Sequence, residues 1–235
     1  MINKITDAQS LPSSPTCHKP MLSDAVFRPM LFSTKMVQAL LDGRKTQTRR
    51  VVKDKLLQHF RDDDSLFSTI YPAIHHPIKM ENIIWVRETF YQFASDVFHY
   101  KAKNGDEYAW KNHDFGIKYK PSLFMPKSAC RIWLKVSNVR VERLHDITEQ
   151  DAINEGVDSC FEKGTEYYKE GDYKNYTWHG EGGNDSFSGY SNAKNAKESY
   201  QSLWYKINGK KTWDENPFVW VYDFEVSQDC PNGFR

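Results

Sequence analysis

Short strand-like segments are the feature of this sequence that most constrains its fold. They are rich in Ile, Val, Trp and Phe, and they lie at residues 28–32, 82–90, 130–136, 138–144 and 216–226. In one of them Val139 and Val141 alternate with charged residues, as in a half-buried strand. No regular alternation of strand with helix accompanies them, so a parallel sheet is not expected. An α+β fold, with a small mixed or antiparallel β-barrel and short flanking helices, accommodates these segments best.

Three short helices are predicted between the strands. The first is capped by Ser33 or Thr34, and Gly43 ends it. The second, at residues 145–157, begins with a capping box from Thr148 to Asp151, and Gly156 ends it. The third, at residues 198–208, is predicted to be part of the core because its apolar residues recur at helical spacing, at Tyr200, Leu203, Trp204 and Ile207.

A single domain is expected over residues 26–228, with two long insertions at about 91–127 and 158–197. Residues 1–25 are rich in Ser and Pro and are predicted to form a flexible lead, and residues 229–235 a short tail. The 158–197 insertion carries five aromatic residues that either stack on bases or pack the loop onto the domain, namely Tyr167, Tyr168, Tyr173, Tyr176 and Trp178.

Charge and cysteine content limit the classes of function. The net charge is +1, so any affinity for nucleic acid has to come from a local patch, and residues 35–55 supply seven basic against two acidic residues. The four cysteines are scattered and His75–His76 has no suitably spaced companions, so neither a disulfide framework nor a metal site is predicted. Without a signal-peptide pattern or a membrane-length apolar stretch, a cytoplasmic protein that does not contact membranes is expected.

The basic octet GRKTQTRR, residues 43–50, is the principal candidate site. Arg44, Lys45, Arg49 and Arg50 can neutralise phosphate, and the hydroxyls of Thr46 and Thr48 can donate to phosphate oxygens. Lys45 and Thr48 also form a possible pair of base and nucleophile. A solvated basic turn is the third interpretation. Residue types alone favour phosphate binding or solvation over catalysis.

Two further candidates carry charge near predicted elements. Glu155 lies off the buried face in the last turn of its helix, which predicts an exposed surface residue. Arg87 and Glu88 are adjacent at the end of a strand and so point to opposite faces. One of the two is expected to be buried and paired, either in a structural ion pair or in a contact with a ligand.

The order of these segments resembles that of ASCH-domain proteins, in particular the larger phage and prophage branch of the family. The resemblance covers roughly residues 28–226 apart from the insertions, in RPMLFSTKMVQALLDGRKTQTRRVV, NIIWVRETF, RIWLKVSNVRVERLHDITEQDAINEGV and SLWYKINGK…W…NPFVWVYDFEV. Membership of this family implies a PUA-like β-barrel with a cleft suited to RNA, nucleotides or modified bases.

Small bacterial ASCH proteins include an amidohydrolase that deacetylates N4-acetylcytidine. Its motif G-R-K-T-x-T implies here that Lys45 is the proton acceptor and Thr48 the nucleophile, and that Glu155 is the proton donor. No metal or organic cofactor is implied. This chain departs from the small enzymes by its length, its TRRV segment and its insertions. The remaining charged and hydroxyl candidates are assigned to the sugar or phosphate of the ligand: Arg44, Thr46, Arg49, Arg50, Arg87 and Glu88.

Three functions follow from the resemblance and the octet. The first is an amide hydrolase acting on a modified nucleoside, nucleotide or RNA base. The second is a non-catalytic reader of single-stranded RNA, in which the octet binds backbone and aromatic side chains stack on bases. The third is an RNA nuclease that uses the same cleft.

Overall fold

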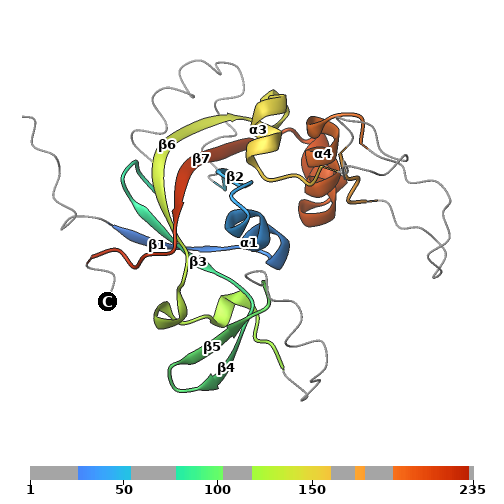
Figure 1. The fold of residues 1–235 in the computed structure, drawn as a ribbon. Coiled ribbons are helices and arrows are strands. Elements are labelled where there is room, and N and C mark those ends of the chain that lie inside the picture. The colour runs from blue at the N-terminus through green and yellow to red at the C-terminus, as the bar shows by residue number, and fades with distance from the viewer. Residues whose placement is uncertain (1–25, 54–77, 103–117, 160–172, 178–192, 233–235) are drawn as a thin grey trace, which may run out of the picture.

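The computed structural model describes residues 26–53, 78–102, 118–159, 173–177 and 193–232 (Figure 1). Several predictions concern residues outside these ranges: the N-terminal lead 1–25, the pair His75–His76, and the aromatic residues Tyr167, Tyr168 and Trp178.

A mixed five-stranded sheet forms the centre of the fold, which confirms the α+β class. Its strands are β1 (Phe27–Leu31), β2 (Gln47–Val51), β3 (Ile83–Arg87), β6 (Trp133–Arg143) and β7 (Phe218–Ser227). They follow the order β1-β3-β6-β7-β2, in which β1 and β3 are parallel and all other neighbours are antiparallel. Among the described residues no ladder joins the edge strands β1 and β2, so the sheet does not close into a barrel.

Strand β6 replaces two predicted strands, and that division of the sequence was wrong. The ladder with β7 continues through a register irregularity, where Val136 pairs with Phe224 and Asn138 with Asp223. The extra residue forms a bulge that bends the strand without ending it. Figure 1 shows β6 and β7 bending together in an arc, with α1 (Thr34–Leu41) on its inner side.

Strand β2 consists of the last four residues of the basic octet and Val51, a segment where no strand was predicted. It pairs antiparallel with β7, with Thr48 opposite Tyr222 and Arg49 opposite Val221. Successive side chains therefore point to opposite faces of the sheet, Thr48 and Arg50 to one and Gln47 and Arg49 to the other. The sequence did not indicate this strand because its residues are mostly charged or polar, and such residues are buried only where distant segments supply partners for them.

The predicted helix caps are confirmed. Helix α1 begins at the Ser33 cap and is followed by Gly43 with a φ of 72°. Helix α3 (Glu149–Asn154) has the capping box between Thr148 and Asp151, and Gly156 after it has a φ of 85°. Helix α4 (Ala196–Asn208) leads through Gly209 into a short helix that was not predicted, α5 (Lys210–Asp214).

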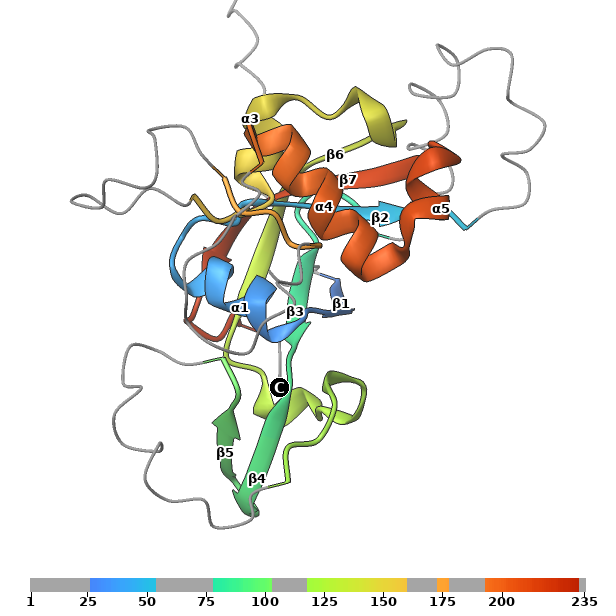
Figure 2. The ribbon, with the colours of Figure 1, turned by 90° about the vertical axis from the view of Figure 1, so that its right-hand side faces the viewer.

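Two apolar cores cover the two faces of the sheet. On one face α1 contributes Val37 and Leu40 to a cluster with residues of β3, β6 and β7. On the other face α3, α4 and α5 pack over Val219 and Val221 of β7 (Figure 2). The prediction for α4 is confirmed in part, because Tyr200 and Trp204 are buried whereas Ile207 is 50% exposed. No helix in the described ranges is both long and apolar enough to cross a membrane.

A separate lobe occupies most of the predicted insertion at 91–127. The hairpin of β4 (Phe90–Ala94) and β5 (Val97–Tyr100) packs with two 3₁₀ turns, η3 (Ser122–Phe124) and η4 (Lys127–Ala129). It has its own small core of Phe90, Met125 and Ala129. A third turn, η5 (Leu144–Asp146), joins β6 to α3. Figure 2 shows the hairpin at the opposite end of the molecule from α3.

The Trp204→Ala change tests the assignment of α4 to the core. Trp204 is 4% exposed, so its removal leaves a cavity and should lower the free energy of unfolding by roughly 3–5 kcal/mol. Ile207→Ala on the same helix is the control and should change it by no more than about 0.5 kcal/mol. Urea denaturation of both variants measures the difference, and equal midpoints would show that Trp204 contributes no core packing.

Candidate functional site

Lys45 is buried in an ion pair with Glu155, with only 1% of its surface exposed. Its Nζ lies 2.7 Å from Glu155 Oε2 and also donates to the backbone oxygens of Glu155 at 2.9 Å and Gln47 at 2.8 Å. These three bonds use all the protons of the ammonium group. Burial lowers the pKa of Lys45, and the negative charge of Glu155 opposes that shift. Lys45 is therefore not part of a solvated basic turn.

The prediction that Glu155 is an exposed surface residue is wrong. Glu155 caps the C-terminus of α3 and is 5% exposed. Its carboxylate is bonded by Lys45 and lies 3.3 Å from Arg49 Nη1. A buried carboxylate is tolerated only when it is paired, and here two cations supply the pairing.

Gly156 allows Lys45 to approach α3 closely. A Cβ at this position would lie 2.9 Å from Lys45 Cβ and 3.0 Å from Ala39 Cβ, closer than real side chains come. Two bonds hold the chain on either side: Thr46 N donates to Asn154 O, and Arg44 Nη1 donates to Gly156 O. Backbone geometry at Gly156 thus fixes the position of the Lys45–Glu155 pair.

Arg49 is the centre of a wider charge cluster, which we define as Lys45, Arg49, Glu142, Asp151 and Glu155. Its guanidinium lies 2.6 Å from Glu142 Oε1 and 3.3 Å from carboxylate oxygens of both Asp151 and Glu155. The side chain is fully buried. Because three carboxylates already surround it, Arg49 does not present a free cation to a phosphate.

Arg50 joins the two edge strands of the sheet. Its Nη1 donates to Thr48 Oγ1 at 2.9 Å, and its Nη2 donates to Leu31 O, at the end of β1, at 3.0 Å. The guanidinium also lies over the ring of Phe32, 5.2 Å from its centroid. Thr48 itself is fully buried, and its hydroxyl oxygen accepts the bond from Arg50.

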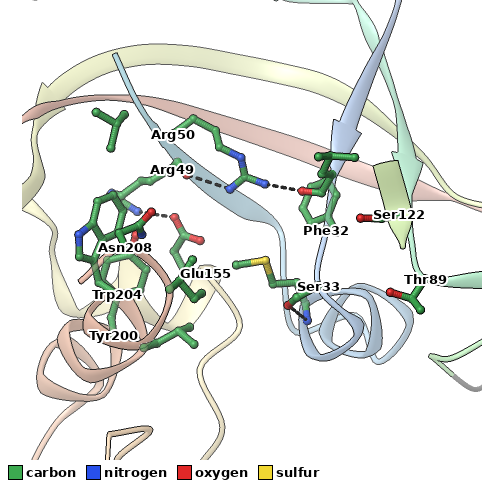
Figure 3. A pocket seen from close by; sticks show the side chains of 15 residues that line it. Phe32, Ser33, Arg49, Arg50, Thr89, Ser122, Glu155, Tyr200, Trp204 and Asn208 are labelled. Atoms are coloured by element: carbon green, nitrogen blue, oxygen red, sulfur yellow. Dashed lines mark hydrogen bonds and ion pairs between the residues drawn. The ribbon is translucent and has the colours of Figure 1, made fainter. Parts of the chain in front are cut away.

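A pocket of about 380 Å³ opens beside this cluster. In Figure 3 Tyr200 and Trp204 lie on one side of it and Phe32 and Ser33 on the other, with Glu155 and Arg50 between them. Thr89 and Ser122 bring the hairpin end of the molecule to its edge. A second hollow of about 330 Å³ adjoins it, and the two share Ser33, Met36, Glu155, Leu203 and Ile207.

Of the three predicted catalytic residues, only Glu155 lines the pocket. Lys45 is in contact with Glu155 but, like Thr48, is not part of the wall in the described region. Lys45 and Thr48 are not hydrogen-bonded to each other in that region, because Nζ is directed to Glu155 and Gln47. The structure thus brings Lys45 and Glu155 together and places Thr48 behind Arg50.

The predicted phosphate-binding residues are dispersed. Arg49 and Arg50 line the pocket, whereas Arg44 is exposed and paired with Asp42 and Asp158. Thr46 is exposed and takes part in backbone bonds.

Arg87 and Glu88 lie at the base of the hairpin. Arg87 donates to Leu123 O, and Glu88 is buried in a salt bridge with Arg131, 2.8 Å between Oε1 and Nε. The expected structural ion pair is therefore present, between Glu88 and Arg131.

Sequence reasoning did not identify three contributors to the site: Gln47, Glu142 and Asp151. Gln47 Nε2 donates to Asp151 Oδ1, and Arg140 donates to both Glu142 and Asp151. For Glu142 the signal was the alternation of charged with apolar residues in β6, and for Asp151 it was the capping box, but neither pattern specifies the partners in the site. Tyr176, one of the insertion aromatics, is 6% exposed and its hydroxyl accepts from Asp158 N, so it packs against the domain.

Comparison of the chain with models of known protein families, with curated proteins and with solved structures found no match. In the described ranges, His, Cys, Asp and Glu side chains form no group that could hold a metal ion. The site therefore has to be interpreted from its own geometry.

The Gly156→Ala change tests the close approach to Lys45. Gly209 has nearly the same φ, 84° against 85°, but nothing lies within 4 Å of a Cβ there, so Gly209→Ala measures backbone strain alone. Gly156→Ala should lower the free energy of unfolding by about 1–3 kcal/mol more than this control, because Lys45 must also move. Chemical denaturation gives both values, and equal losses would contradict the steric argument.

Acid titration tests the charge cluster through Asp151. Burial alone would raise the pKa of Asp151, but hydrogen bonds from Gln47 and Thr148 and the charge of Arg49 lower it from 3.8 to about 2. A lower pKa in the folded state means that this stabilisation is complete above about pH 4 and is lost as the pH falls toward 2. Asp151→Asn should flatten the dependence of urea midpoints on pH in that window. The exposed Asp229→Asn is the control and should leave the dependence unchanged.

Proposed function

We propose that this protein is a hydrolase that removes an acyl group from the modified base of a nucleoside or nucleotide, as in an N4-acylated cytidine. One observation carries the proposal: a buried Lys–Glu ion pair, Lys45 with Glu155, whose carboxylate reaches the wall of a pocket. A buried pair of this kind suits proton transfer, because burial brings the pKa of a lysine toward the working range. The resemblance to ASCH-domain proteins, with their PUA-like barrel, suggests the substrate class.

The lining of the pocket suits a planar, polar ligand. Aromatic side chains from both sides, Phe32 and Tyr200 among them, provide apolar surface. Glu155 offers acceptor oxygens and Arg50 a guanidinium, which match the donors and acceptors on the edge of a base. The volume of about 380 Å³ is within the range of small-molecule sites.

The proposed chemistry assigns one step to each of three residues. Within the buried pair one ammonium proton of Lys45 first moves to the carboxylate of Glu155, which leaves a neutral amine and a carboxylic acid. Thr48 Oγ1 then attacks the amide carbonyl, Lys45 accepts the hydroxyl proton, and Glu155 gives its proton to the departing amine of the base. Water then hydrolyses the acyl-threonine. The bond from Arg50 to Thr48 Oγ1 favours this step, because a cationic donor stabilises the developing alkoxide.

A rearrangement is part of this mechanism. The ammonium group of Lys45 is bonded to Glu155 and Gln47, and Arg50 lies between Thr48 and the pocket. Substrate binding has to redirect Lys45 to Thr48 and to move Arg50 Nη2 from Leu31 O toward the ligand, while Nη1 keeps its bond to Thr48 Oγ1. A ligand phosphate or base carbonyl would provide the new partner for Arg50.

A second function, a reader that binds a modified base without altering it, is favoured by one observation. All three protons of the Lys45 ammonium group have acceptors, so these bonds are sufficient to stabilise the buried lysine. A role as a catalytic base is not needed to explain its burial. In that case Glu155 and Arg50 only recognise the base.

Turnover of N4-acetylcytidine by the wild-type protein and two pairs of variants separates the two functions. Thr48→Val keeps the size of the side chain and should lower kcat by about 10²-fold or more, while Thr48→Ser retains activity. Lys45→Arg keeps the charge but cannot act as a base at neutral pH, so it too should lose turnover. If Lys45→Arg disrupts folding because position 45 is buried, Glu155→Gln tests the same ion pair, since it keeps the shape of the side chain. Lys53→Ala changes an exposed residue and is the control.

The outcomes are distinguishable. Unchanged turnover of Thr48→Val would exclude Thr48 as the nucleophile. If the wild-type protein binds acetylated cytidine but releases no acetate, the reader function replaces the hydrolase. Cleavage of labelled RNA under the same conditions would instead indicate a nuclease.

A further inference from the structure

The hairpin lobe, defined as residues 88–102 and 118–131, concentrates the exposed apolar surface of the molecule. The described residues include ten large hydrophobic side chains that are exposed. Five of them belong to this lobe: Phe93, Val97, Tyr119, Leu123 and Phe124. Phe93 and Phe124 are the most exposed of all ten, at 72% and 66%. Such a concentration on one small element is typical of a binding surface.

In the described part of the lobe the hairpin carries aromatic side chains on both faces. Phe90, Phe98 and Tyr100 pack against the small core of the lobe. On the other face, His99 stacks on Tyr91 with an interplanar angle of 25° and meets Phe93 edge to face at 85°. This face therefore carries a row of aromatic rings, of which Phe93 is exposed and Tyr91 and His99 are half-buried.

The described part of the lobe carries more positive than negative charge. Glu88 and Arg131 neutralise each other, which leaves Asp96 against four exposed lysines, Lys101, Lys118, Lys120 and Lys127. The residues between the two parts of the lobe, 103–117, add two basic and three acidic residues. The stretch 88–131 as a whole thus has a net charge of +2, in a chain whose net charge is +1.

The lobe is continuous with the pocket. Ser122 lines the pocket, and Leu123 and Phe124 follow it directly in the turn η3. Thr89, immediately before β4, lines the same pocket. A polymer with one base in the pocket would therefore have a neighbouring unit close to Leu123 and Phe124.

From these observations we infer that the hairpin lobe binds single-stranded nucleic acid, with bases stacked on the exposed aromatic rings and phosphates near the lysines. Exposed aromatic rings interleaved with cations are the general means of binding single strands, whereas a protein partner requires no cations and no ordered rings. The inference rests on the proposed function in one respect, because it makes the substrate of the pocket a nucleotide within a strand rather than a free nucleoside.

Fluorescence anisotropy with a labelled RNA of about twelve nucleotides tests the inference on the full chain. Phe93→Ala and Phe124→Ala should each weaken binding at least about fivefold, the loss of one stacked base. Combining Lys118→Ala with Lys120→Ala should reduce the salt dependence by up to about 1.4 units in log–log slope. Met80→Ala and Lys211→Ala alter exposed side chains outside the lobe and serve as controls that should bind as the wild type does.

Substitutions at Phe93 distinguish stacking from general apolar contact. Phe93→Trp keeps a ring and should preserve the affinity for RNA, whereas Phe93→Leu keeps apolar area but loses the ring and should weaken binding as alanine does. A single-stranded DNA of the same sequence shows whether the 2′-hydroxyl contributes. Equal affinity of the wild type and all lobe variants for the RNA would overturn the inference. A double-stranded RNA of the same sequence that binds as tightly as the single strand would also overturn it.

Turnover separates this inference from the proposed function. The lobe variants should hydrolyse free N4-acetylcytidine as the wild type does but lose the advantage that the wild type has on an acetylated strand. Hydrolysis of the free nucleoside with no preference for the strand would leave the proposed function intact and refute the role of the lobe. Strand binding through the lobe without any turnover would refute the hydrolase and support the lobe.

Discussion

The burial of Lys45 and Arg49 against Glu155 is the interaction on which the rest of the site depends. Neither cation nor carboxylate would be stable in the interior alone, because an unpaired buried charge costs several kcal/mol. The cluster joins the segment after α1, the edge strand β2, the strand β6 and the end of α3. Charge neutralisation therefore holds these elements in register where apolar packing does not reach.

The pocket lies where the sheet is left open. Its wall includes the end of β1 and the residues of β2, the two edge strands, and Arg50 connects them through Leu31 O. A fully closed barrel would have joined these strands by a backbone ladder and left less room between them. The side chain of Arg50 takes the place of that ladder and connects the two edge strands.

Local signals in the sequence predicted the local structure. The capping box at Thr148 and the glycine stops at Gly43 and Gly156 depend on neighbouring residues, and each is present. Strand β2 and the burial of Glu155 were missed because they depend on contacts between distant segments: Lys45 and Glu155 are 110 residues apart. The resemblance singled out the residues of this pair, but no local pattern indicated that they are buried together.

The position of β2 in the sheet has a consequence for synthesis of the chain. Its only ladder partner among the described strands is β7, with Gln47 paired to Asp223. During translation the basic octet therefore emerges long before the strand that orders it, and contacts of such large sequence separation form slowly. Until β7 leaves the ribosome, β2 has no ladder partner among the described strands, so the part of the pocket wall that β2 contributes cannot take its final position.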